Sequence, residues 1–286
     1  MLVRHVALVA EKSRIKAHEL SRVAAALQKQ VTRDFAPIWN VSATVDSFAR
    51  LEDVPVGYWP VVVADNVKGA AGYHDNEDDG QPYALVEFAP DWPLTASHEV
   101  LEMLADPYGR HIIAGNSPKP SQGRVSFLVE VCDPSEEAEY GYTVNGIVVS
   151  DFYTPDFFEP KKVGSTRYSF TGAITEPRQV LPGGYLSWRD PTTKQWYQLQ
   201  RFTKVPKFVT LGAKQDSGSL RAWIDRQTNA ARSELGLGTS KQQLRAFASV
   251  RSASEKATRA SASQLRRQIK TLVERHRRVA AARPKG

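Results

Sequence analysis

The aromatic residues of this 286-residue chain lie almost entirely in its first three quarters. Of the 27 Phe, Trp and Tyr residues, only Trp223 and Phe247 lie beyond Gly212. Because aromatic side chains contribute much of the buried area of a core, we expect the core to form from residues 1–212. The composition, with 41% hydrophobic and 24% charged residues, is that of a globular protein and excludes wholly disordered, collagen-like and multi-span membrane chains.

The charge of the chain divides at nearly the same point. Residues 214–286 contain 17 Lys+Arg and 5 Asp+Glu, a balance of +12. Subtraction from the totals of 38 and 31 leaves 21 basic and 26 acidic residues before them, a balance of −5. We therefore predict a domain over residues 1–212, followed by a basic, Ala/Ser/Arg-rich helical tail over residues 213–286.

The cysteine content and the N-terminus indicate the compartment. Cys132 is the only cysteine, so the chain cannot form an intramolecular disulfide, and a reducing environment is expected. The apolar run at residues 5–10 is too short for the core of a signal peptide or for a membrane span. We expect a cytoplasmic protein without membrane contact.

The order of apolar patterns in residues 1–212 predicts an α+β fold. Helical spacing occurs at residues 18–35, and a second helix begins within residues 93–97 and ends before Pro107. Residues 72–80 are acidic and turn-rich and are expected to form a loop. Strand patterns predict a β-rich second half; the expected strand segments are residues 3–9, 41–48, 61–63, 83–88 and 126–131, with hairpins at 142–149 and 185–200.

The second helix contains the pentapeptide His98-Glu99-Val100-Leu101-Glu102. Residues four positions apart lie on one face of a helix, so His98 and Glu102 can hold one metal ion. Glu99, one position further round, can reach a water on that ion and accept its proton. A bound dication lowers the pKa of its water toward about 7, so this arrangement is typical of metal-dependent hydrolysis.

This helix resembles the active helix of the zincin metallopeptidases, which carries HExxH, with Glu102 in place of the second histidine. The strand before the helix and the downstream segment at residues 129–134 are similar to zincin-like proteins of an HExxE…DP type. The resemblance covers about residues 1–200. It implies a zincin-like mixed sheet with an active-site helix, and a zinc-dependent peptidase with Glu99 as general base. One imidazole with two carboxylates is a harder ligand set, so Mn or Fe is an alternative.

The third metal ligand must come from another segment of the chain. The resemblance favours Glu130, with Asp133 second, and Cys132 and His111 are further candidates. Asp106 lies about 12 Å along the helix axis from His98, so we expect it to support the site or the following loop. Two further residues are candidates for contact with the transition state; they are Tyr153 and His74.

Two other interpretations remain open. The pentapeptide also fits an ordinary amphipathic helix, and the metal site could be structural in a non-enzymatic interaction protein. In the tail, a helix seam with 4,3,4,3 spacing is formed by Leu265, Ile269, Leu272, His276 and Val279, while basic residues cover the opposite face. The tail is therefore expected to bind a second copy or a protein partner, with nonspecific nucleic acid as the alternative.

Overall fold

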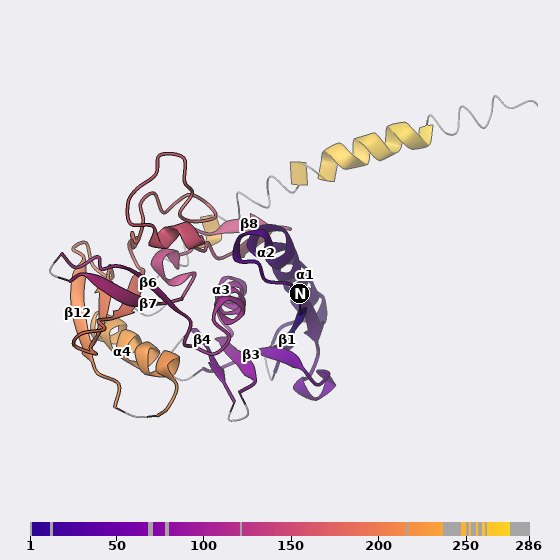
Figure 1. Cartoon of the computed structure of the whole chain (residues 1–286). Coiled ribbons are helices and arrows are strands. Elements are labelled where there is room, and N and C mark those ends of the chain that lie inside the picture. The colour runs from indigo at the N-terminus through magenta and orange to yellow at the C-terminus, as the bar shows by residue number, and fades with distance from the viewer. Residues whose placement is uncertain are drawn as a thin grey trace, which may run out of the picture.

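The computed structural model shows a mixed fold of helices and several β-sheets, in agreement with the predicted α+β class (Figure 1). It describes the whole chain apart from residues 1, 12–13, 68–70, 78–79, 121, 216, 237–246, 250–251, 253–255, 257–258, 261 and 275–286. Within the described residues, none of the helices combines the length and the apolar character that a bilayer crossing requires.

The first half of the chain forms a five-stranded mixed sheet. Its strand order is β2 (Ala43–Phe48), β1 (Arg4–Ala10), β3 (Tyr58–Ala64), β5 (Pro82–Glu87), β4 (Gly72–Asn76). The first four strands in this order are parallel, and β4 pairs antiparallel with β5 at the edge. Residues 6–9 of β1 are completely buried, as expected for a central parallel strand covered on both faces.

The segment expected as a loop at residues 72–80 is instead partly a strand. Residues 72–76 form β4, and Gly72 at its start lies close to the helix that follows β5. A polar sequence with a glycine is compatible with an edge strand, since one side of the strand needs no partner. The correction matters because His74 lies on β4.

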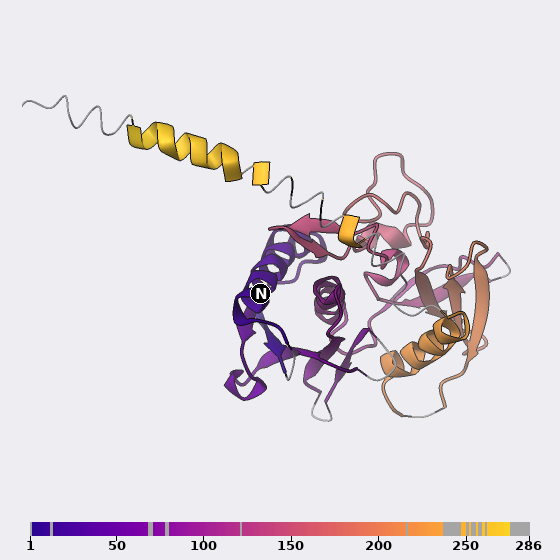
Figure 2. The same ribbon diagram turned by 180° about the vertical axis from the view of Figure 1, so that it is seen from behind.

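Helices cover one face of this sheet. The predicted helix at residues 18–35 comprises α1 (Ala17–Lys29) and a π-helical segment, η1 (Gln30–Phe35), and it continues into α2 (Ala36–Trp39). Asn40, with φ of 53°, then ends the run. The helix with the pentapeptide is α3 (Trp92–Ala105), which lies at the centre of the molecule in both views (Figures 1 and 2). Pro93 occupies its first turn, where a missing N–H costs nothing.

The second half is rich in β-structure, as predicted. An antiparallel sheet has the order β12 (Lys207–Gly212), β11 (Trp196–Gln200), β10 (Tyr185–Arg189), β7 (Arg124–Leu128), β6 (Ile112–Asn116). The hairpin of β8 (Tyr142–Val144) and β9 (Ile147–Val149) turns through Asn145 and Gly146, both with positive φ. Short 3-10 turns occur at η2 (Leu51–Asp53), η3 (Asp133–Ser135) and η4 (Pro155–Phe158).

Helix α4 (Leu220–Glu234) lies beyond the predicted domain boundary at residue 212 but packs against the body. Ile224 is fully buried in a cluster with Leu128 and Trp196, and the helix also contacts β4. Ser219 caps its first turn by accepting a hydrogen bond from the Ala222 N–H. The structure therefore adds α4 to the folded body, because its apolar face completes a small core there.

The rest of the tail makes little contact with the body where it is described. Phe247 is buried against Leu94, Ala138 and Val148. Helical residues 262–274 point away from the body (Figures 1 and 2), and the side chains of Leu265, Ile269 and Leu272 are about 60% exposed. His276, Val279 and the arginines beyond Glu274 lie outside the described residues.

Candidate functional site

Helix α3 is held in place by a buried polar network. The Ser97 hydroxyl donates to Gln30 Oε1 at 2.8 Å and accepts from the Ser150 N–H at 2.9 Å. Gln30 Nε2 in turn donates to the Ser150 carbonyl at 3.0 Å. Gln30 is the first residue of the π-helical segment, and such segments often occur near functional sites. The residue next to Ser97 is His98, so this network sets the position of the candidate ligand.

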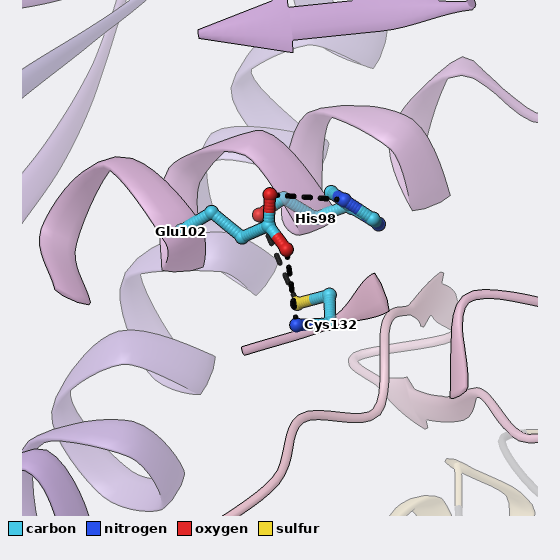
Figure 3. Close-up of side chains that lie close together, drawn as sticks. All are labelled: His98, Glu102 and Cys132. Carbon is cyan, nitrogen blue, oxygen red and sulfur yellow. Dashed lines mark hydrogen bonds and ion pairs between the residues drawn. The ribbon is translucent and has the colours of Figure 1, made fainter. Parts of the chain in front are cut away.

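His98 and Glu102 lie together on one face of α3, as their spacing predicts (Figure 3). His98 Nε2 is 3.2 Å from Glu102 Oε2. Burial opposes the charge on His98, but the Glu102 carboxylate and the contact with Asp133 raise the pKa of His98 well above its usual value. Burial also acts against the Glu102 charge, yet His98 and Arg221 lower the pKa of Glu102 below its usual range. In the metal-free protein Glu102 and His98 therefore stabilise each other's charged forms, and a metal ion would have to displace the His98 proton, because a ligating imidazole is neutral.

The segment that follows β7 closes against α3. Strand β7 ends at Leu128, so Glu130 lies beyond the strand on which we expected it. The Cys132 N–H donates to Glu102 Oε1 at 3.1 Å (Figure 3), and Asp133 Oδ1 lies 3.3 Å from His98 Nε2. Burial, followed by the Glu102 charge, raises the pKa of Asp133 well above its usual value. The structure thus brings all three acidic-segment candidates, Glu130, Cys132 and Asp133, to the helix.

His74 reaches the same place from the edge strand β4. Its Nδ1 lies 3.4 Å from Glu99 Oε2 and 3.9 Å from Glu102 Oε2, and its side chain is almost completely buried. Strand and helix are so close that a Cβ on Gly72 would lie 2.6 Å from Thr95 Cγ2 and 2.9 Å from Glu99 Oε1. The absence of a side chain at residue 72 thus leaves room for Glu99.

Arg221 of α4 completes the cluster, and the sequence analysis did not identify it. Its guanidinium contacts Glu102 Oε2 at 3.1 Å and Glu130 Oε2 at closer range, and lies 3.6 Å from Asp133 Oδ2. Asp225, one turn further along α4, holds its Nε at 3.0 Å. In a tail with so many basic residues, nothing in the sequence distinguishes Arg221 except an acidic partner four positions away.

The other candidates have different surroundings. Asp106 accepts hydrogen bonds from the N–H groups of Arg110 and His111, so it fixes the turn after α3. His111 is exposed, and its ring contacts the Ala105 carbonyl. Tyr153 is buried among aromatic rings, and its hydroxyl accepts a hydrogen bond from the Glu130 N–H. The structure therefore gives Tyr153 a contact that positions Glu130.

The donor atoms fit a metal ion. Among the described residues, two sets of three donors lie within 4.8 Å of one another: His98, Glu102 and Cys132, and His74, Glu102 and Glu130. Several buried oxygens make no hydrogen bond within the described part of the chain; they are Glu102 Oε2, both oxygens of Glu130 and both oxygens of Asp133. Four of these five oxygens already lie within ion-pair distance of His98 or Arg221, and Glu130 Oε1 is the exception among these contacts. A metal ion here would share or replace these ion pairs, which compensate the burial of the carboxylates.

A cavity of about 480 Å³ opens beside this cluster. His98, Glu99 and Asp133 form part of its wall, and Arg221 and Asp225 line it from the side of α4. Residue 71 and Gly72, the first residue of β4, also line it. A substrate in this cavity would therefore meet the candidate ligands and Glu99 together.

Comparison of the chain with protein-family models, with curated proteins and with solved structures finds no match.

Proposed function

We propose that this protein is a metal-dependent hydrolase that cleaves a peptide or a similar amide bond. The observation that supports this most directly is the convergence of His98, Glu102 and further buried carboxylates beside a cavity that His98, Glu99 and Asp133 line. A divalent ion held there would supply a water of lowered pKa and would polarise a substrate carbonyl. Zinc is the first choice, with Mn or Fe as alternatives for this oxygen-rich ligand set.

In this proposal each residue of the chain has a definite task. His98 and Glu102 hold the ion, and the backbone of Cys132 orients Glu102 through Oε1. Glu99 accepts the proton of the attacking water, and His74 holds its carboxylate. The third ligand is Cys132, which lies in one donor set with His98 and Glu102, or Asp133, whose Oδ1 is 3.3 Å from His98 Nε2; Glu130 lies in the donor set of His74.

The position of the edge strand β4 supports the choice of a peptide substrate. The antiparallel edge strand β4 lies next to the helix with the metal-binding motif, and its first residue lines the cavity. An extended peptide can pair with an edge strand through backbone hydrogen bonds.

The charged side chains of the cavity wall indicate the charge of the substrate. Outside the cluster the wall includes four acidic side chains and one basic side chain; the acidic ones are Glu87, Asp91, Glu136 and Glu137, and the basic one, Arg232, is paired with Glu136. Acidic walls around a cavity concentrate cations near it. We therefore propose a substrate with a Lys or Arg side chain or a free amino group near the cleaved bond.

The proposal predicts that metal content depends on His98. Elemental analysis of the protein purified without added metal should find bound metal in the wild-type protein and a large loss in His98→Ala. His111→Ala is the matched control, because this exposed histidine contacts only a backbone carbonyl in the hydrogen-bond network. Metal-free wild-type protein, or equal metal in wild-type and His98→Ala proteins, would contradict the proposal.

The role of Glu99 is tested by activity. Glu99→Gln should retain metal but lose about 10²- to 10⁴-fold in kcat on a peptide library, because the amide cannot accept a proton. Glu87→Gln, on the same cavity wall, serves as the control and should retain most of the activity.

A second candidate function is a structural metal site in a non-enzymatic interaction protein. It is favoured by Arg221, which contacts three carboxylates of the cluster and so neutralises part of their charge. Bound metal together with the absence of hydrolysis in wild-type protein, on peptides of varied charge, would support this alternative.

A further inference from the structure

One oxygen of Glu102 lies between two histidines from different elements. Glu102 Oε2 is 3.2 Å from Nε2 of His98 on α3 and 3.9 Å from Nδ1 of His74 on β4. Glu102 is also the residue that the two donor sets share. Each set contains one imidazole of its own and at least one further donor, Cys132 on the side of His98 and Glu130 on the side of His74.

The charges of the cluster indicate how many cations it can bind. Five carboxylates belong to the cluster. Arg221 contacts four of them, and His74 contacts the fifth; together they are Glu102, Glu130, Asp133, Asp225 and Glu99. Arg221 is the only permanently charged cation among these contacts within the described residues. If all five carboxylates are ionised, a single dication bound by a neutral histidine leaves two of the negative charges uncompensated. Two dications and Arg221 together balance all five.

We propose that the site holds two divalent cations bridged by Glu102. The first is the ion of the proposed function, at His98, and the second binds His74 and Glu130. This inference rests on the proposed function for the first ion. In known two-metal sites the ions are about 3.5–4 Å apart, a spacing that one bridging carboxylate provides, and such pairs bind both the attacking and the leaving oxygen of a substrate.

Arg221 contacts both carboxylates of the second donor set, so the second ion would replace its contact with Glu102 Oε2, which is 3.1 Å long. Its guanidinium contacts Oε2 of Glu130, which leaves Glu130 Oε1 without a hydrogen-bond partner among the described residues. The carboxylate can therefore bind an ion through one oxygen and Arg221 through the other. His74 is compatible as well, because one of its ring nitrogens lies within 4.8 Å of donor oxygens of Glu102 and Glu130, and its Nε2 makes no hydrogen bond within the described part of the chain.

The test counts Mn²⁺ ions in the full-length protein. Chelator-treated protein is titrated with Mn²⁺ by calorimetry, and the bound metal is measured by elemental analysis and by electron paramagnetic resonance. Wild-type protein should bind two ions per chain with an exchange-coupled spectrum. His74→Gln should bind one uncoupled ion, whereas the control His111→Gln should bind two coupled ions.

The outcomes separate this inference from the proposed function. One uncoupled ion in the wild-type protein would overturn the second site and leave the proposed function intact, and it would mean that protons neutralise the remaining carboxylates. No bound ion would overturn both. Circular dichroism shows whether His74→Gln folds, and if it does not, the number of ions and the coupling in the wild-type protein decide the question without a variant.

Discussion

Asp225 stands at the outer end of the buried cluster and holds the arginine that contacts the candidate ligands. Burial raises the pKa of its carboxyl to about 6, an effect that Arg221 and His74 oppose and that Glu99 and Glu102 increase. The same side chain in the unfolded chain has its usual pKa of 3.8. Ionisation of the Asp225 carboxyl therefore lowers the free energy of unfolding of the metal-free protein as the pH rises.

The sign of this effect follows from proton binding. Between pH 4 and pH 6 the folded protein keeps a proton on Asp225 that the unfolded chain has lost, so raising the pH through this range weakens the fold. A difference of about two pH units corresponds to roughly 3 kcal/mol. The free energy of unfolding is measured by denaturant titration in the presence of a chelator. Between pH 4 and pH 6 it should fall in the wild-type protein by up to about this amount more than in Asp225→Asn. A constant difference between the two proteins across this range would contradict the prediction.

At the scale of elements, the approach of β4 to α3 decides where Glu99 lies. Gly72 makes the approach possible, because any Cβ at this position would overlap Thr95 and Glu99. The Gln30–Ser97–Ser150 network fixes the opposite side of the same helix. The helix is therefore located by contacts on both sides, and a side chain at residue 72 must displace a group that the proposed reaction uses.

Gly72→Ala should reduce activity more than it reduces metal content. The added methyl group pushes Glu99 from its position, and a displacement of 1 Å in an active site can cost about 10²-fold in rate. Overpacking of this kind also costs about 1–3 kcal/mol of stability, which thermal unfolding measures. Gly123→Ala is the control, since a Cβ there meets no atom within 4 Å. Equal activities in the two variants would show that the approach does not position Glu99.

At the scale of the whole molecule, the folded body extends through α4, beyond residue 212, where the composition changes. Helix α4 buries Ile224 against the second sheet and brings Arg221 to the site. The apolar stripe of Leu265, Ile269 and Leu272, in contrast, is exposed. Association through that stripe, or binding of a protein or nucleic acid by the tail, stays a prediction.

Two truncations test this division. A chain that ends at residue 236 should keep its metal and its fold, because it retains α4, although it loses the contact of Phe247 with Leu94. A chain that ends at residue 212 should unfold more readily, since it exposes Leu128 and Trp196 and leaves Glu102 and Glu130 without Arg221. Thermal unfolding and metal analysis compare the two chains. Light scattering of the longer one shows whether removal of the stripe lowers the association state, as we expect.

The sequence by itself determined the features that depend on near neighbours. Spacing along one helix places His98 and Glu102 on a common face, and Asn145-Gly146 forms the hairpin turn through its own backbone preferences. Local patterns also indicated the α+β class and most of its strands. These predictions succeeded because period and turn chemistry act over a few residues.

Only the tertiary structure decided which distant residues surround the helix. His74 lies on a segment expected to be a loop, and Arg221 lies in a segment expected to be a tail, yet both contact Glu102. Their positions follow from strand pairing at β4 and from burial of Ile224. Neither event leaves a local signal in the sequence, because it depends on free energy gained when surfaces far apart in the chain are buried together.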